Sequence, residues 1–235
     1  MKERNFNNYY LGRSNISAYS FLLASIFLPG RFMNPLYIYG SSGVGKTHML
    51  RAVQHLDNNF IPARRTAYTT VRELCDELVK SIQNGELCRM YEERYRGADI
   101  VMIDDVQYIA DKNATQDVLA QLILTLCDRN QQVIMACDRP LKTFPVLYVR
   151  MHTRFGRLRE VEIFLPDRKL RKKLIRKKSK AMGLTLSEEA DAYIMENASV
   201  SPQIDGLLNE LKLWRKMNES CSRRKIGTIH RDTHT

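Results

Sequence analysis

One short segment has the residue types and spacing needed to bind a polyphosphate. It fits the pattern G-x-x-x-x-G-K-[ST] at every fixed position and consists of Gly40, Ser41, Ser42, Gly43, Val44, Gly45, Lys46 and Thr47. The glycines allow backbone N–H groups to turn around phosphates, and Lys46 can reach the β- and γ-phosphates. The Thr47 hydroxyl can ligate magnesium. We therefore predict a P-loop that binds ATP together with Mg²⁺, in preference to a chance glycine-rich turn.

Two adjacent carboxylates, Asp104 and Asp105, directly follow the apolar run Ile100–Ile103. Neighbouring carboxylates repel each other unless a cation or a water network uses them. With a P-loop in the same chain, we expect Asp104 to assist magnesium binding. We expect Asp105 to orient or deprotonate the water that attacks the γ-phosphate. The alternative is a polar end of a strand with no catalytic role.

A pair of arginines, Arg150 and Arg154, has the spacing of residues on one face of a helix. Arginine suits a γ-phosphate because its guanidinium is always charged and can bind two oxygens at once. One of these residues could therefore complete the nucleotide site of a neighbouring molecule. The alternative is surface arginine on a basic chain.

The expected elements place these groups at one edge of a sheet. Short apolar runs predict strands at residues 36–39, 67–69, 100–103, 133–136 and 161–165, and helices are expected at 16–28, 46–56, 71–95 and 115–129. Alternation of strands and helices predicts an α/β fold, a parallel sheet with helices on both faces. Ligands of such sheets bind at the carboxyl ends of the strands, where Gly40, Asp104 and Asp138 are expected.

Three regions are predicted along the chain. Residues 1–165 form the nucleotide-binding α/β domain, residues 166–219 a small all-helical lid, and residues 220–235 a basic, disordered tail. The segment Asp167–Lys178 has a narrow apolar stripe at helical spacing with cations around the rest. This stretch is either the solvated face of a lid helix or a surface for phosphate backbone or filament contacts.

Composition limits the classes of partner. The chain has 235 residues and a formal net charge of +11, which favours either an anionic partner, nucleic acid before membrane, or simply a solvated surface. Its five cysteines include no C-x-x-C pair, so reduced thiols are expected and a zinc site is not. Neither an export signal nor an apolar stretch long enough to span a bilayer is present, and we expect a cytoplasmic protein.

Taken together, the motifs of the chain resemble those of the ATPase module of DnaA-type replication initiators, which are AAA+ ATPases. The resemblance runs from about Phe6 to Leu213. It rests on Asn34–Gly40 leading into Gly45-Lys46-Thr47-His48, on Tyr91–Arg96, on Ile103-Asp104-Asp105-Val106-Gln107-Tyr108, on Cys137-Asp138-Arg139-Pro140 and on Arg154-Phe155-Gly156.

The resemblance implies roles for individual residues. Asp138 matches the sensor-1 position, Arg154 the arginine finger and Arg150 a second basic residue beside it, while His48 belongs to the nucleotide-binding motif. Residues 71–95 resemble the insertion through which initiators stack into a filament. Val79 and Lys112 match positions that contact single-stranded DNA, and Leu11, Gly12 and Asn15 resemble the segment around adenine.

Two departures from the family pattern affect the expected function. Pro202 stands where the family has its sensor-2 arginine, and a proline side chain cannot contact a phosphate, so weak turnover is expected. The N-terminal domain and the helix-turn-helix domain of an initiator are expected to be missing.

Three functions follow from this pattern. The first is an ATP-dependent ATPase that self-assembles into a filament and contacts the backbone of single-stranded DNA. The second is a short paralogue that regulates a full-length initiator, and the third is a loader that binds the replicative helicase.

Overall fold

The computed structural model describes residues 4–31, 33–61, 63–75, 94–156 and 158–229. The chain divides into two compact units, residues 1–165 and residues 166–235. Val79 and most of the 71–95 segment lie outside the described residues, so the predictions made for them stay predictions.

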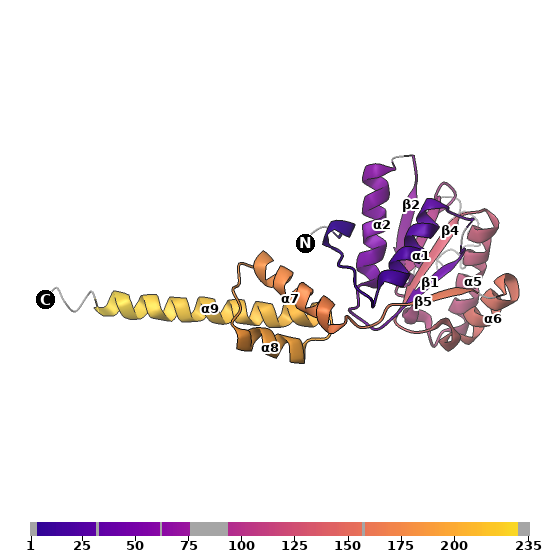
Figure 1. The fold of residues 1–235 in the computed structure, drawn as a ribbon. Coiled ribbons are helices and arrows are strands. Elements are labelled where there is room, and N and C mark those ends of the chain that lie inside the picture. Colours follow the sequence, from indigo (N-terminus) through magenta and orange to yellow (C-terminus); the bar gives the residue numbers. More distant parts are fainter. Residues whose placement is uncertain (1–3, 32, 62, 76–93, 157, 230–235) are drawn as a thin grey trace. The chain divides into compact units, whose positions relative to one another are not determined.

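The first unit is built on five parallel strands in the order β2-β3-β4-β1-β5 (Figure 1). The strands are β1 (Leu36–Tyr39), β2 (Thr66–Thr70), β3 (Ile100–Asp104), β4 (Gln132–Cys137) and β5 (Arg159–Glu162). The helical elements of this unit are η1 (Phe6–Asn8), α1 (Ile16–Phe27), α2 (Lys46–Phe60), η2 (Val106–Ile109), α5 (Asn113–Asp128), η3 (Leu141–Thr143) and α6 (Pro145–Phe155).

Both faces of the sheet are covered, which explains why β3 and β4 are buried along their whole length. Alternate strand residues point to opposite faces. Val101, Ile103 and Val133 belong to the core shared with α5 and α6. Figure 1 shows α1 and α2 on the other side of the sheet. The predicted α/β fold, with a parallel sheet between two layers of helices, is confirmed.

The last strand differs from its prediction. The sequence predicts a strand at 161–165, but β5 is Arg159–Glu162 and its register pairs Glu162 with Tyr39. Beyond Glu162, the Ile163 N–H still donates to the Tyr39 carbonyl at 2.7 Å. Because β1 ends at Tyr39, β1 has no further residue with which Phe164 or Leu165 could pair. Phe164 and Leu165 leave the sheet and are exposed.

A buried glutamine connects the elements that position α6. The Gln116 side chain is fully buried on α5. Its Nε2 donates to the carbonyls of Ile109 and Ala110 at 3.1 and 2.8 Å. Its Oε1 accepts the N–H groups of Val146 and Leu147, in the first turn of α6, at 3.2 and 3.3 Å. Gln116 thus satisfies free N–H groups at the start of α6, the helix that carries Arg150 and Arg154.

The second unit consists of α7 (Arg168–Ala181), α8 (Glu188–Asn197) and α9 (Ser201–Ile229). Asp167 caps α7 by accepting the Leu170 N–H at 2.7 Å. The unit buries Ile175, Ile194, Ile204 and Leu208. The helix α9 continues to Ile229, whereas the sequence predicts a disordered tail from residue 220. No proline interrupts residues 220–229, so no residue there lacks the N–H group that a helix uses.

Among the described residues, none of the helices combines the length and the apolar content that a membrane crossing requires.

We predict that Gln116→Leu lowers the free energy of unfolding by about 2–3 kcal/mol, because four buried or half-buried backbone groups lose their partner. Thermal or urea unfolding measures this change. Gln121→Leu, an exposed position on the same helix, is the matched control and should change stability by less than about 0.5 kcal/mol. Equal stability of the two variants would show that Gln116 does not hold α6 in place.

Candidate functional site

The P-loop connects β1 to α2 and must pass very close to other backbone. A Cβ atom at Gly40 would lie 2.2 Å from the carbonyl oxygen of Ile163, so only glycine fits there. Gly45 has φ +109° and lies against the ring of Tyr9. The Gly40 N–H donates to the Cys137 carbonyl at 3.2 Å, which ties the start of the loop to the end of β4.

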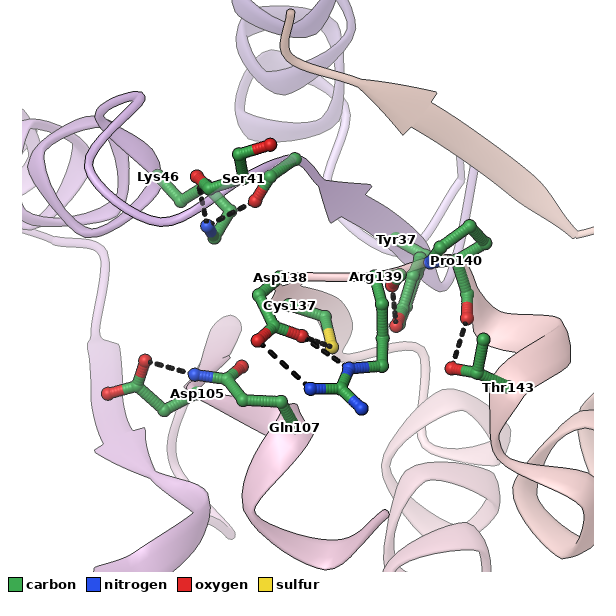
Figure 2. Close-up of polar contacts among 11 residues, drawn as sticks. Tyr37, Ser41, Lys46, Asp105, Gln107, Cys137, Asp138, Arg139, Pro140 and Thr143 are labelled. Atoms are coloured by element: carbon green, nitrogen blue, oxygen red, sulfur yellow. Dashed lines mark hydrogen bonds and ion pairs between the residues drawn. The ribbon is translucent and has the colours of Figure 1, made fainter. Parts of the chain in front are cut away.

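Lys46 points back into the loop. Its Nζ donates to the carbonyls of Gly40 and Ser41 at 2.5 and 3.1 Å (Figure 2). The side chain is buried, and burial lowers the pKa of Lys46, while Asp104 and Asp138 act in the opposite direction. The two carboxylates favour the charged form of this buried amine, and the resulting ammonium group can bind a phosphate.

The rest of the loop offers backbone groups and the hydroxyls of Ser41, Ser42 and Thr47. Ser41 and Ser42 are exposed, Val44 is buried, and Gly43 has φ +82°. Thr47 is half-buried at the start of α2, where the free N–H groups and the dipole of a helix favour an anion.

The carboxylate of Asp104 is fully buried and both of its oxygens accept hydrogen bonds. Oδ1 accepts the Asp105 N–H at 2.9 Å, and Oδ2 accepts the Tyr68 hydroxyl at 2.8 Å. Burial raises the pKa of Tyr68, which keeps the hydroxyl protonated as a donor. The Arg51 guanidinium lies 3.4 Å from the centre of the Tyr68 ring. Tyr68 and Arg51 therefore fix the orientation of Asp104.

The residues present fit a magnesium ion of the kind that accompanies ATP. Mg²⁺ keeps several waters and uses one or two protein oxygens together with phosphates. Asp104 and Thr47 supply such oxygens. The part of the chain that the structure describes contains no group of three or more His, Cys, Asp or Glu side chains that could hold a metal without a nucleotide.

Asp105 differs from Asp104 in exposure and in backbone conformation. It has φ +58° and ψ 42°, a left-handed conformation that costs free energy for a non-glycine residue. Its side chain is exposed, and Oδ1 accepts the Gln107 Nε2 at 2.9 Å (Figure 2). Because it is exposed, the Asp105 carboxylate is accessible to a water molecule.

Asp138 follows β4 and is paired with its neighbour. The Arg139 guanidinium donates to both carboxylate oxygens, at 2.6 and 3.2 Å. This pairing lowers the pKa of Asp138, and Lys46 contributes in the same direction. The Arg139 carbonyl accepts the Tyr37 hydroxyl at 2.8 Å, which fixes the backbone at this strand end (Figure 2). Lys46, Asp104 and Asp138 thus interact electrostatically, as their predicted positions at the strand ends require.

The N-terminal segment packs on the P-loop helix. His48 Nε2 lies 2.7 Å from Asn8 Oδ1 and 3.2 Å from the Asn5 carbonyl, and the Tyr9 ring contacts His48 edge to face. Asn15 is buried and donates to the Tyr9 hydroxyl and the Tyr10 carbonyl.

These contacts give Asn15 and His48 a structural role. Asn15 Oδ1 also accepts the Gly12 N–H at 2.9 Å, so Asn15 and His48 order the segment that leads to the P-loop. Leu11 is exposed on the same segment, and its predicted place beside adenine stays a prediction.

The arginines of α6 lie at the surface, paired with acids of α5. Arg150 Nε donates to Asp117 Oδ1 at 2.8 Å, and an Arg154 side-chain nitrogen lies 2.7 Å from Asp128 Oδ1. More than half of each arginine side chain is exposed. The two residues share a helix face, as their spacing predicts.

An aromatic ring in the loop after β3 has two cations beside it. Lys112 Nζ lies 4.6 Å and the Arg72 guanidinium 4.5 Å from the centre of the Tyr108 ring, which is 41% exposed. An exposed ring with cations beside it suits a stacked base and its phosphate. Sequence reasoning predicted a DNA contact for Lys112, which stays a prediction, and did not predict the contacts of Tyr108 with Arg72 and Lys112.

The fold and this site define a P-loop ATPase of the AAA+ class. The family model of the bacterial DnaA ATPase domain matches residues 1–160. The chain therefore belongs to the bacterial DnaA ATPase-domain family.

Individual relatives agree. The chromosomal replication initiator protein DnaA of Symbiobacterium thermophilum is 32% identical over 213 residues, which are 90% of this chain and 46% of that protein. The chain spans about half the length of the curated relatives it matches.

Solved structures give the same result. Domain III of Thermotoga maritima DnaA has a TM-score of 0.81 at 29% identity, covering 93% of this chain and 91% of that one. A replication initiator DnaA bound to AMPPCP and single-stranded DNA has a TM-score of 0.80 at 28% identity, covering 96% and 69%.

We predict that Tyr68→Phe raises the Mg²⁺ concentration needed for half-maximal ATPase activity several-fold, because Asp104 loses one of two hydrogen bonds. The ring and its contact with Arg51 remain, so thermal stability should change little. Tyr39→Phe is the matched control, since the Tyr39 hydroxyl contacts Glu162 instead. An unchanged Mg²⁺ requirement in Tyr68→Phe would exclude the positioning role.

Proposed function

We propose that this chain binds ATP with magnesium in the P-loop and hydrolyses it as part of an assembly that acts in the initiation of DNA replication. The observation that carries this proposal is that the P-loop with Lys46 follows β1, while Asp104 ends β3 and Asp138 follows β4, so that all three lie at the carboxyl edge of adjacent parallel strands. The cytoplasm is the expected site of action.

Each residue has a distinct task in the proposed reaction. Lys46 neutralises charge on the β- and γ-phosphates, while Thr47 and Asp104 hold the metal side of the nucleotide. Asp105 orients the attacking water and takes its proton. Asp138 senses the γ-phosphate through its charge, and Arg139 keeps the Asp138 carboxylate ionised.

Hydrolysis is proposed to be slow. Pro202 lies in the first turn of α9, where proline is well tolerated because the N–H it lacks is not needed. Its side chain carries no charge for a phosphate. The lid therefore supplies no cation from the position at which the family pattern has arginine.

We further propose that a neighbouring molecule completes the site. Arg154 is exposed and pairs with an acid of its own chain, so it can exchange Asp128 for a γ-phosphate of the next protomer. Arg150 lies one turn away and adds positive charge.

Contact with single-stranded DNA is proposed for the loop after β3. The cluster of Arg72, Tyr108 and Lys112 offers stacking and phosphate contacts together. Such binding should weaken as salt concentration rises.

A second candidate is a regulatory paralogue that docks on a full-length initiator, and Pro202 favours it because slow hydrolysis suits a nucleotide-gated partner. A pull-down against the full-length initiator, with and without ATP, separates the two. Capture of the initiator without self-assembly would favour the paralogue.

We predict that Lys46→Ala abolishes ATP binding, whereas Asp105→Asn keeps binding within about threefold and lowers the turnover rate at least about 100-fold. Calorimetric titration and a phosphate-release assay measure the two effects. Loss of binding in Asp105→Asn, or retained binding in Lys46→Ala, would contradict the assigned roles.

We predict that Arg154→Ala binds ATP normally as a monomer and loses most of its turnover at protein concentrations where the unmodified chain assembles. The reason is that Arg154 acts in the nucleotide site of the next protomer, so its loss leaves the nucleotide site of its own chain unchanged. Lys142→Ala, another exposed cation, serves as the control. Full turnover of Arg154→Ala at high protein concentration would disprove the shared site.

A further inference from the structure

The helix α7 in the second unit has a charge distribution that the nucleotide site does not explain. Nine of its 14 residues are Lys or Arg and none is acidic. Its apolar side chains pack inside the unit, where Leu170, Leu174 and Ile175 are buried.

The cations of α7 fall into two groups. The first group is half-buried and holds the unit together: Arg171 donates to the carbonyls of Met195 and Ala198, and Lys178 lies 2.6 Å from both oxygens of Asp205. The second group is exposed and occupies every exposed position of α7 except Ala181. It comprises Arg168, Lys169, Lys172, Lys173, Arg176, Lys177 and Lys180.

Acidic residues of α8 lie near part of the exposed group. An open groove of about 1130 Å³ is lined by Arg168, Lys172, Arg176 and Lys180 on the α7 side and by Glu188, Asp191 and Glu196 on the α8 side. Lys169, Lys173 and Lys177 do not line this groove. They follow one another at intervals of four residues, so they form a ridge about 12 Å long on one side of the helix.

We propose that this ridge, Lys169–Lys173–Lys177, is a binding surface for the phosphate backbone of duplex DNA, separate from the nucleotide site and from the Tyr108 cluster. Ammonium groups on a rigid helix match a rigid row of phosphates, and a duplex carries one charge per about 1.7 Å.

Two other anionic partners fit the surface less well. A membrane surface requires apolar side chains beside the cations, and the large apolar side chains of α7 are buried. Single-stranded nucleic acid requires exposed rings for stacking, and α7 has no aromatic residue.

The test uses the full chain without nucleotide and a 30-base-pair duplex of mixed sequence. Affinity is measured by fluorescence anisotropy between about 50 and 200 mM salt. The variant Lys169→Gln/Lys173→Gln/Lys177→Gln removes the ridge charges with little change in helix propensity. The control Arg31→Gln/Arg129→Gln/Lys142→Gln removes the same charge from exposed positions of the first unit.

The ridge variant should bind duplex at least about tenfold more weakly at 100 mM salt, and its slope of log K against log salt should shrink by about 2–3. The control should stay within about twofold of the unmodified chain. ATP binding by the ridge variant should be unchanged, and Lys46→Ala should bind duplex normally, so a failure here is distinguishable from a failure of the proposed ATPase function.

An unchanged affinity and slope in the ridge variant would overturn the proposal. So would binding of the unmodified chain to vesicles containing anionic lipid without binding to duplex. If the triple variant loses cooperative thermal unfolding, Lys177→Gln alone replaces it, and its expected change in slope is about one.

Discussion

The structure of the site depends on keeping a buried ammonium group next to buried carboxylate charge. Lys46 and Asp104 are both buried, and burial disfavours the charged form of Lys46 by lowering its pKa. Every oxygen of Asp104 accepts a hydrogen bond, and Lys46 donates to two carbonyls of its own loop. The parallel sheet makes this arrangement possible, because the ends of β1, β3 and β4 meet at one edge.

The polar groups around this edge are arranged in two layers. Lys46, Asp104 and Asp138 form the layer that we propose contacts the nucleotide, while Tyr68, Arg51 and Arg139 hold the two carboxylates in place. Pre-set orientation of this kind avoids reorganisation when charge develops during phosphoryl transfer. The arginines of α6 lie outside both layers, which is consistent with a role toward another molecule.

Much of this could be predicted from the sequence, for definite reasons. The P-loop pattern, the apolar runs of β3 and β4 and the aspartates after them are local signals, so their positions and their common edge followed directly. The end of β5 could not be predicted, because it is set by where β1 stops. Tyr68 was missed because its partner is 36 residues away, although its place on a strand adjoining β3 gave a weak signal. Arg72 and Tyr108 were missed for the same reason, since their contact depends on the fold.

The central claim is that a triphosphate and its metal bind between the P-loop amides, the Lys46 ammonium and the Asp104 carboxylate. Calorimetric titration of ATP into the chain, with and without Mg²⁺, tests it most directly when repeated with Asp104→Asn. The account predicts binding that Mg²⁺ strengthens in the unmodified chain and a clearly smaller Mg²⁺ effect in Asp104→Asn. Absence of any binding heat and of any thermal shift with Mg²⁺ and ATP would contradict it.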